Sequence, residues 1–198
     1  SIPFFLYLFS LDNIFFLKTA VPGDLYQKSE ILNFSNKILI ISSIIFFYAI
    51  PFLITGVYKI DWHNKLNIAL ALILLLFLQF GFSYTYEWMG GGIFFKTSKL
   101  LFENNYLFYF ICFFSLFFLI EICKNNLNSI MIIFCLLLSN PQITIYHKYY
   151  DPLILIIFLL LLNFKTDSKK LFKLKNLIIF YIYFAFFLVI NILKTQIL

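Results

Sequence analysis

Residues 38–58, ILIISSIIFFYAIPFLITGVY, form a run of 21 positions without a charged side chain. A helix needs about 20 apolar residues to cross a lipid bilayer, so this run predicts a membrane-spanning helix. Pro51 lies inside the run and predicts a kink, at which one backbone carbonyl group loses its amide donor. We expect that carbonyl to be covered by a neighbouring helix or by a hydroxyl group such as that of Ser43 or Thr55.

The composition extends this prediction to the whole chain. Of the 198 residues, 63% are hydrophobic and only 12% are charged, whereas about a quarter of an average soluble domain is charged. The apolar runs are continuous and do not alternate with polar residues, which predicts helices and not the strands of a β-barrel. The fold class we expect is therefore all-α, a polytopic transmembrane helical bundle.

The chain is predicted to form one transmembrane domain, residues 1–198, with about six spans. The predicted spans are residues 38–58, 66–86, 104–123, 127–146, 152–164 and 176–193. Residues 2–17 are also apolar and predict a partial span or a helix that lies in the membrane interface. Short amphipathic interfacial helices are expected within residues 18–37 and 93–103. Because the chain begins at Ser1 without a methionine, we expect it to be the C-terminal part of a longer protein.

Lysine residues orient the predicted bundle. If each run crosses the bilayer, the connectors around residues 59–65, 124–128 and 165–175 share one side, and the other connectors share the opposite side. All 15 basic residues are Lys, and the last of these connectors holds Lys165, Lys169, Lys170, Lys173 and Lys175. Basic residues favour the cytoplasmic side, so we place the 165–175 loop in the cytoplasm. The membrane we expect is the inner (plasma) membrane of a bacterium. The formal charge of +6 is scattered between apolar runs, which indicates membrane-surface contact and argues against nucleic acid as a partner.

The richest group of polar side chains lies in residues 139–152, SNPQITIYHKYYDP. Asp151 is a typical N-cap and Pro152 a typical first helical residue, so a helix from Pro152 to residue 164 would have 13 residues, or roughly 20 Å. This is shorter than the bilayer core of about 30 Å, which places Asp151 below the headgroups, where ionisable side chains are candidates for function. Alternatively, the helix starts near Tyr146, Pro152 kinks it, and the polar side chains form an ordinary interfacial belt.

The spacing in this stretch suggests two kinds of chemistry. His147 lies four residues and Lys148 three residues before Asp151, so both can reach the carboxylate within a helical turn. A His–carboxylate pair can transfer a proton, and a lysine with tyrosine hydroxyl groups can bind a phosphate or pyrophosphate headgroup. A local ion pair is the alternative. The residues with a predicted role in substrate binding here are Gln142, Lys148, Tyr149 and Tyr150.

A second candidate loop contains Glu87 and Trp88 before three glycines, Gly90 to Gly92. The glycines permit positive φ and close approach of the backbone, as in a mobile loop over a ligand, or they form a flexible turn. The catalytic residue itself is not assigned. The candidates for catalysis are His147, Asp151 and Glu87, and the candidates for substrate binding also include Trp88 and Lys96.

Other polar residues inside the apolar runs are predicted to hold the bundle together. Glu121, Gln79 and Asn140 are expected to face other helices, because polar side chains at membrane depth usually do so. The cysteines lack metal-ligand spacing and are interpreted as small buried hydrophobic residues: Cys112, Cys123 and Cys135. No metal site and no cofactor is predicted.

The predicted layout has four features: many spans, functional loops on the outer face, amphipathic surface helices in these loops, and the His-Lys-Tyr-Tyr-Asp cluster at residues 147–151. This layout resembles the C-terminal part of a polytopic glycosyltransferase of the GT-C superfamily, whose members use polyprenyl-phosphate sugars. The resemblance covers most of the chain and matches no specific motif. It implies a catalytic Asp or Glu in the first outer loop, a region that this sequence does not contain, and a role for Lys148, Tyr149 and Tyr150 on the lipid-phosphate side of the site.

The function we expect is that of an integral membrane glycosyltransferase that moves a sugar from a lipid-phosphate donor on the outer face of the membrane. Membrane lipid and a polyprenyl-phosphate-linked sugar are then its expected partners. The alternatives are a transporter, in which broken helices around Asn140 and Pro152 line a midplane site, and a non-enzymatic accessory subunit. The sequence does not decide between these classes, and it does not set the oligomeric state.

Overall fold

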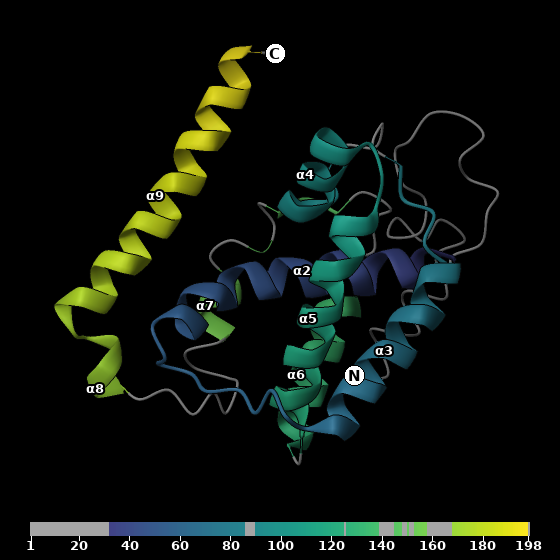
Figure 1. Ribbon diagram of the computed structural model, residues 1–198, viewed down its shortest axis with the longest axis horizontal. Helices are drawn as coiled ribbons and strands as arrows, with labels where there is room; N and C mark the ends of the chain where they lie inside the picture. Colours follow the sequence, from purple (N-terminus) through teal and green to yellow (C-terminus); the bar gives the residue numbers. More distant parts are fainter. Residues whose placement is uncertain are drawn as a thin grey trace, which may run out of the picture.

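The computed structural model describes residues 32–85, 90–124, 126–138, 145–147, 150, 153–157 and 168–197 of the chain. Every regular element in these residues is a helix, which confirms the predicted all-α class for this part of the chain. The elements are α2 (Leu32–Ile54), α3 (Lys65–Phe80), α4 (Gly92–Phe102), α5 (Tyr106–Cys123), α6 (Leu127–Leu138), α7 (Leu153–Ile156), α8 (Ser168–Leu171) and α9 (Leu174–Ile197) (Figure 1).

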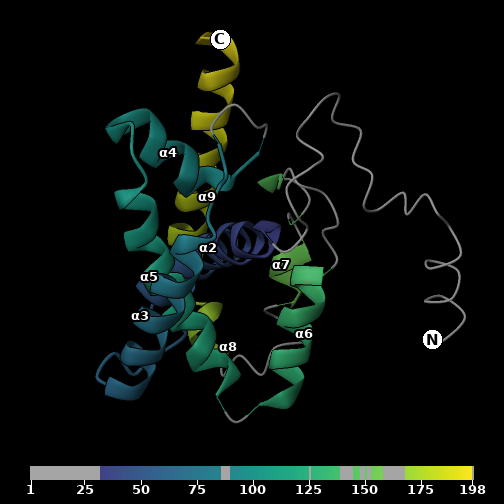
Figure 2. The same ribbon diagram turned by 90° about the vertical axis from the view of Figure 1, so that its right-hand side faces the viewer.

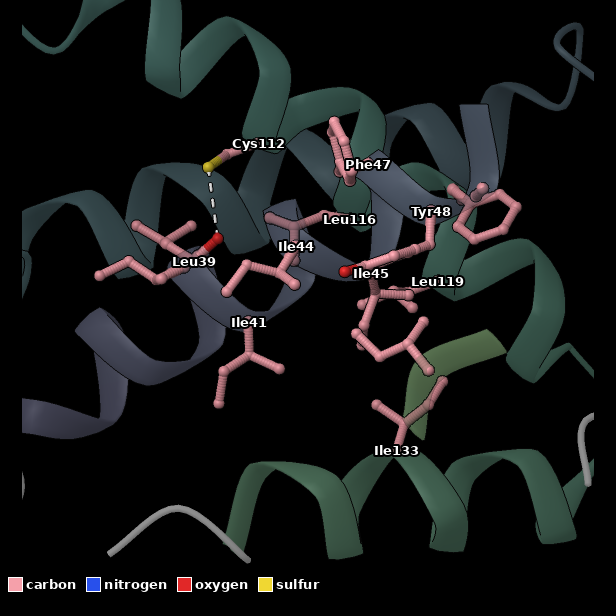
Figure 3. Close-up of a cluster of buried hydrophobic side chains, with 14 of the residues drawn as sticks. Leu39, Ile41, Ile44, Ile45, Phe47, Tyr48, Cys112, Leu116, Leu119 and Ile133 are labelled. Atoms are coloured by element: carbon pink, nitrogen blue, oxygen red, sulfur yellow. Dashed lines mark hydrogen bonds between the residues drawn. The ribbon is translucent and has the colours of Figure 1, made fainter. Parts of the chain in front are cut away.

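α2 lies at the centre of the protein. Residues 35–53 include no exposed side chain, and Leu39, Ile40 and Ile41 are fully buried. A helix that is apolar around its whole circumference is enclosed by protein or by lipid, and for α2 the enclosure is protein, because α3, α4, α5, α6, α7 and α9 all contact it. In Figure 3, side chains of α2 meet Leu116 of α5 and Ile133 of α6. The core of the protein is therefore built around this one helix.

α2 lies across the other long helices. In Figures 1 and 2, which differ by a quarter turn, α5 runs from α4 at one end of the molecule to the α5–α6 turn at the other end, and α2 crosses it between these ends. α3 instead runs beside α5 in the opposite direction. The predicted runs 38–58 and 66–86 therefore do not form the side-by-side antiparallel pair that is typical of consecutive spans.

Two helical segments among the described residues are long and apolar enough to cross a membrane, Phe34–Ile54 and Tyr106–Cys123. Length and composition do not by themselves separate a membrane span from a helix that is enclosed in a protein core. α2 is enclosed by other helices, so its apolar character alone does not make it a span. α3 has 16 residues and α6 has 12, which correspond to roughly 24 and 18 Å of helix. Six spans thus stay a prediction, whereas the helical class is observed.

The predicted runs 38–58, 66–86 and 127–146 extend past the ends of their helices, which are Ile54, Phe80 and Leu138, and α2 begins at Leu32, six residues before the predicted start. The helix in residues 66–86 ends at Phe80, and the chain then turns so that the Ser83 N–H donates to Asn36 Oδ1 at 2.9 Å. The helix in residues 38–58 ends at Ile54, and Gly56 adopts a positive φ of 64°. The extension of these helices to residues 85 and 58 is therefore wrong. Turn-forming glycines and hydrogen bonds to α2 stop them earlier.

Pro51 leaves the carbonyl group of Phe47 without its usual helical donor, because proline has no amide hydrogen. The hydroxyl of Tyr183, which belongs to α9, donates to this carbonyl at 3.0 Å. The prediction that a neighbouring helix covers the carbonyl is thus confirmed. The hydroxyl groups of Ser43 and Thr55, which were the alternative, donate to other carbonyl groups within α2.

The polar residues of the apolar runs differ in role. Asn67 of α3 is buried and donates from Nδ2 to Glu121 Oε2 of α5, so the prediction that Glu121 joins helices is confirmed. Gln79 is exposed, and its predicted contact with another helix is wrong, because the buried stripe of α3 continues through Leu78 instead. Asn140 lies outside the described residues.

The three cysteines agree with their interpretation only in part. Cys112 is buried, and its thiol lies 3.6 Å from the carbonyl oxygen of Leu39. Cys123 is half-buried, whereas Cys135 is exposed on α6. The interpretation of all three as buried residues is therefore wrong for Cys135, because α6 presents that side away from the core.

The connectors gather at two ends of the molecule. The start of α3, the α5–α6 turn and α8 lie at one end in both views, and α4 lies at the other end (Figures 1 and 2). This is the grouping that alternating crossings predict for the connectors around residues 59–65, 124–128 and 165–175. Which end faces the cytoplasm stays a prediction.

The substitution Tyr183→Phe tests the covered carbonyl. It leaves the Phe47 carbonyl without a donor, so we expect the free energy of unfolding to fall by about 1–3 kcal/mol. Tyr181→Phe is the matched control: Tyr181 is 77% exposed, and its substitution should change stability by less than about 0.5 kcal/mol. The measurement is denaturation of the purified chain followed by circular dichroism. In a Pro51→Ala background the new amide can donate to the same carbonyl, so an undiminished cost of Tyr183→Phe there would contradict this account.

Candidate functional site

The structure describes three of the predicted site residues. His147 lies in the short segment 145–147, Tyr150 lies just before α7, and Lys96 lies on α4. The other candidates lie outside the described residues: Glu87, Trp88, Gln142, Lys148, Tyr149 and Asp151. The structure therefore places only the residues that flank these candidates, in the loop after Tyr84 and in the loop around His147.

The triple glycine joins the two predicted loops. Gly90, Gly91 and Gly92 all have positive φ, at 102°, 86° and 75°. The Gly91 N–H donates to the carbonyl of Ile145 at 2.8 Å, and a Cβ on Gly90 would lie 2.5 Å from the same oxygen. The predictions of positive φ and close backbone approach are thus confirmed. Such a packed junction favours a fixed contact over a mobile loop at residues 90–92.

Tyr84 completes this junction and was not found from the sequence. Its hydroxyl accepts a hydrogen bond from the Ile145 N–H at 3.3 Å, and its buried ring packs edge-on against Phe95 of α4 at 5.4 Å. Both backbone polar groups of Ile145 are therefore bonded, which a buried segment requires. A tyrosine at the end of an apolar run, here one of two with Tyr86, carries no sequence signal for such a role, because tyrosines at that depth are common.

His147 lies against the core helix. Its Nε2 is 3.1 Å from the hydroxyl oxygen of Tyr48, a buried residue of α2. The imidazole ring is half-buried, and its centroid lies 5.1 Å from that of Phe47 and 5.2 Å from that of Phe187 on α9. The sequence singled out His147 for its own chemistry, but it gave no sign that Tyr48, nearly one hundred residues earlier, is its partner.

Tyr150 continues the chain from His147 into α7. Its N–H donates to the His147 carbonyl at 3.0 Å, and its own carbonyl accepts from the Ile154 N–H at 2.9 Å. α7 itself begins at Leu153, and Asp151 and Pro152 lie outside the described residues, so the predicted helix start at these two residues stays a prediction. The side chain of Tyr150 is buried, a position that suits packing in the core better than contact with a substrate.

Lys96 lies on a different face of α4 from the site. Phe94 packs near Phe47, with ring centroids 6.0 Å apart, and Lys96 is rotated by roughly 200° around the helix from Phe94. The helix between residues 93 and 103 is present as predicted. The polar residues 96–99 in the middle of this helix do not all face outward. Ser98 is buried, and its hydroxyl accepts a hydrogen bond from the Phe108 N–H at 3.2 Å.

The arrangement offers a hydroxyl–imidazole pair, Tyr48 and His147, enclosed by aromatic rings from α2 and α9. Such a pair can exchange a proton or fix the position of a loop. Among the described residues, no group of three or more His, Cys, Asp or Glu side chains could hold a metal ion. The Tyr48–His147 pair is a candidate proton carrier, and its contacts with α2 and α9 hold the segment that flanks the other candidates.

Comparisons of the chain with protein-family models, with curated proteins and with solved structures found no match. Function is therefore argued from the residues of this chain alone.

The substitutions Gly90→Ala and Gly56→Ala test the docked junction. Both glycines have positive φ, but a Cβ on Gly56 meets no atom within 4 Å, whereas one on Gly90 meets Ile145. We expect Gly56→Ala to lower stability by about 1–2 kcal/mol from backbone strain alone. Gly90→Ala should cost roughly 1–3 kcal/mol more, because the junction has to move. The free energies of unfolding of the two variants provide the check, and equal losses would argue against the junction.

Proposed function

We propose that the protein is an integral membrane protein, and the observation that carries this proposal is the surface of α3. Its buried side chains form one stripe along the helix: Asn67, Ala71, Leu75 and Leu78. The rest of its circumference exposes large apolar side chains, namely Leu66, Leu70, Leu72, Ile73, Leu74, Leu76, Phe77 and Phe80. A surface helix of a soluble protein carries polar residues on that side, so lipid is the solvent that fits α3.

α9 supports the same proposal. It approaches α2 through one stripe of aromatic residues, in which Phe180, Tyr183 and Phe187 contact Phe52 or Phe47. Its other sides expose the apolar residues Ile178, Ile182, Phe186, Leu188 and Val189. Two helices on different sides of the core thus present apolar faces outward. A soluble monomer rarely exposes such continuous patches.

In more detail, we propose that the chain has six spans in the inner membrane of a bacterium. The 165–175 loop then lies in the cytoplasm. α3, α5 and α9 extend between the two ends of the molecule in both views, and they are the helices that fit this version best (Figures 1 and 2). α2 lies across α5 and is enclosed by protein, so in this version it is strongly tilted within the membrane. The backbone group that Pro51 leaves open in this helix, the Phe47 carbonyl, is covered by Tyr183 of α9, as a membrane interior requires.

The activity we assign to this membrane protein is transfer of a sugar from a lipid-phosphate donor on the outer face. The support for it is the junction at Ile145, which brings the loop after Tyr84 and the loop around His147 into one region. In such a transfer, the bond between the sugar C1 and the phosphate oxygen breaks, the acceptor oxygen bonds to C1, and the acceptor proton passes to a base. Lys148 and Tyr149 would bind the departing lipid phosphate, and His147 is a candidate base.

A non-enzymatic membrane protein is the second candidate function, and the burial of Tyr150 favours it. Tyr150 is buried in the core, and His147 is packed among aromatic rings of α2 and α9. Both features suit a segment whose role is to hold a loop in place for a partner protein or a transported solute. The two candidates differ in whether the removal of these side chains abolishes chemistry or only stability.

A lysine in the middle of α3 tests membrane integration. Ile73 and Leu66 are both exposed, but Ile73 lies mid-helix whereas Leu66 lies at the end beside Lys65. In a bilayer Ile73→Lys should cost about 3 kcal/mol of insertion free energy, while Leu66→Lys can reach the headgroups and should cost little. The fraction of chain that resists alkaline carbonate extraction from membranes measures this. Equal tolerance of both lysines, together with release of the unmodified chain by carbonate, would reject the proposal.

The double substitution His147→Ala with Lys148→Ala tests the activity. In the membrane-embedded protein it should lower the transfer of labelled sugar from a polyprenyl-phosphate donor by about 100-fold or more, because general base catalysis alone contributes that much. Because His147 packs on α2, the amount of folded protein in the membrane is measured in parallel and the activity is compared per folded molecule. His63→Ala with Lys65→Ala, at the opposite end, is the control that should keep full activity. Full activity of the His147 and Lys148 variant would remove the site assignment and favour the non-enzymatic candidate.

A further inference from the structure

The turn between α8 and α9 combines exposed charge with exposed apolar side chains. Lys169, Lys173 and Lys175 are exposed. Between them, Phe172 is 73% and Leu174 is 75% exposed. Large apolar side chains at this level of exposure are unfavourable in water, and lysines beside them do not cover them. The combination is typical of a segment that lies in a lipid headgroup region.

Hydrogen bonds fix this turn in place. The Nδ2 group of Asn176, a buried residue at the start of α9, donates to the Lys170 carbonyl at 2.7 Å. The Asn176 N–H donates to the Lys173 carbonyl at 2.9 Å, and the Lys173 N–H donates to the Lys170 carbonyl at 3.2 Å. Because the backbone is held by these bonds, the lysine and apolar side chains are presented together and without much ordering cost.

Asp167, just before α8, is the acidic residue nearest in sequence to the turn, and the charged side chains after it are all basic. Residues 168–198 contain no Asp or Glu. The same end of the molecule carries the start of α3 and the α5–α6 turn, which add further exposed lysines: Lys59, Lys65 and Lys124 (Figures 1 and 2). Of the carboxylates described near this end, Glu121 is bonded to Asn67, and Asp61 accepts from the His63 N–H. This end of the protein is therefore complementary to an anionic surface.

We infer that residues 169–175 form a binding site for the headgroups of anionic membrane lipids. The lysine ammonium groups contact the lipid phosphates, and Phe172 and Leu174 enter the boundary between headgroups and acyl chains. This inference rests on the proposed membrane location and adds to it the charge class of the lipid and the residues that select it. It concerns the end of the molecule opposite to α4, and it is independent of the proposed sugar transfer.

A bilayer fits this turn better than an acidic protein or a nucleic acid does. The lysines alone would suit any polyanion, but Phe172 and Leu174 lead directly into the exposed apolar side of α9. A headgroup layer on top of hydrocarbon provides both environments in the same order. A water-soluble polyanion would leave the two apolar side chains exposed.

The experiment uses the full chain reconstituted in phosphatidylcholine vesicles that contain a trace of spin-labelled phosphatidylglycerol or spin-labelled phosphatidylcholine. The fraction of label immobilised by the protein gives the relative association of each lipid. We expect the unmodified chain to prefer phosphatidylglycerol. The triple substitution Lys169→Gln, Lys173→Gln and Lys175→Gln should lower that preference by about five-fold or more, the effect of at least one lysine–headgroup contact. Added salt at about 1 M should have the same effect on the unmodified chain.

The control changes the same number of lysines at the same end: Lys59→Gln, Lys65→Gln and Lys124→Gln. It should keep most of the preference, because Asp61 lies between Lys59 and Lys65 and Glu121 lies three residues before Lys124, so carboxylates offset part of the charge of these lysines. An equal loss in both triple variants would overturn the inference, since net charge alone would then explain the preference. Equal association of both lipids with the unmodified chain would also overturn it. A chain that carbonate releases from the vesicles would instead reject the proposed membrane integration, so the two failures are distinguishable.

Discussion

The enclosure of α2 is the constraint on which the rest of the structure depends. No side chain from residue 35 to residue 53 is exposed, so every side of this helix needs a partner. The partners also satisfy its backbone, since the Phe47 carbonyl left open by Pro51 is bonded by Tyr183 of α9. Serine hydroxyls meet between α5 and α2, where Ser115 of α5 donates to Ser42 at 3.3 Å. The positions of α5 and α9 therefore follow from what α2 requires.

The candidate site is an extension of the same core. Phe47 lies between Phe94 of α4, His147 and Phe187 of α9, and Tyr48 bonds the imidazole of His147. A change at His147 would therefore act on the packing of α2 as well as on any chemistry. This is why the activity test compares catalysis with the amount of folded protein. The exposed apolar sides of α3 and α9 do not depend on the packing of the candidate site. They are the sides of these helices that the core does not cover.

The helices were predictable from the sequence, but their arrangement was not. Charge-free runs of about 20 residues predict helices, and three consecutive glycines predict positive φ at residues 90–92. The partner of those glycines, Ile145, could not be predicted, because contacts between distant segments leave no local pattern. In α3 the buried and the exposed faces are both apolar, so no periodicity marks the side that packs; Gln79 was misplaced for this reason. The crossing of α2 over α5 has no signal in the sequence, because enclosure by protein and contact with lipid select the same side chains.

The central claim is that α2 is enclosed by protein while α3 and α9 face lipid. It is tested most directly by photolabelling the chain in a bilayer with a diazirine reagent dissolved in the hydrocarbon, followed by peptide mapping with mass spectrometry. The account predicts strong labelling of residues 65–80 and 174–189 and almost none of residues 39–49, although all three segments are apolar. Labelling of residues 39–49 as strong as that of α3 would contradict it, and so would an absence of labelling in all three segments.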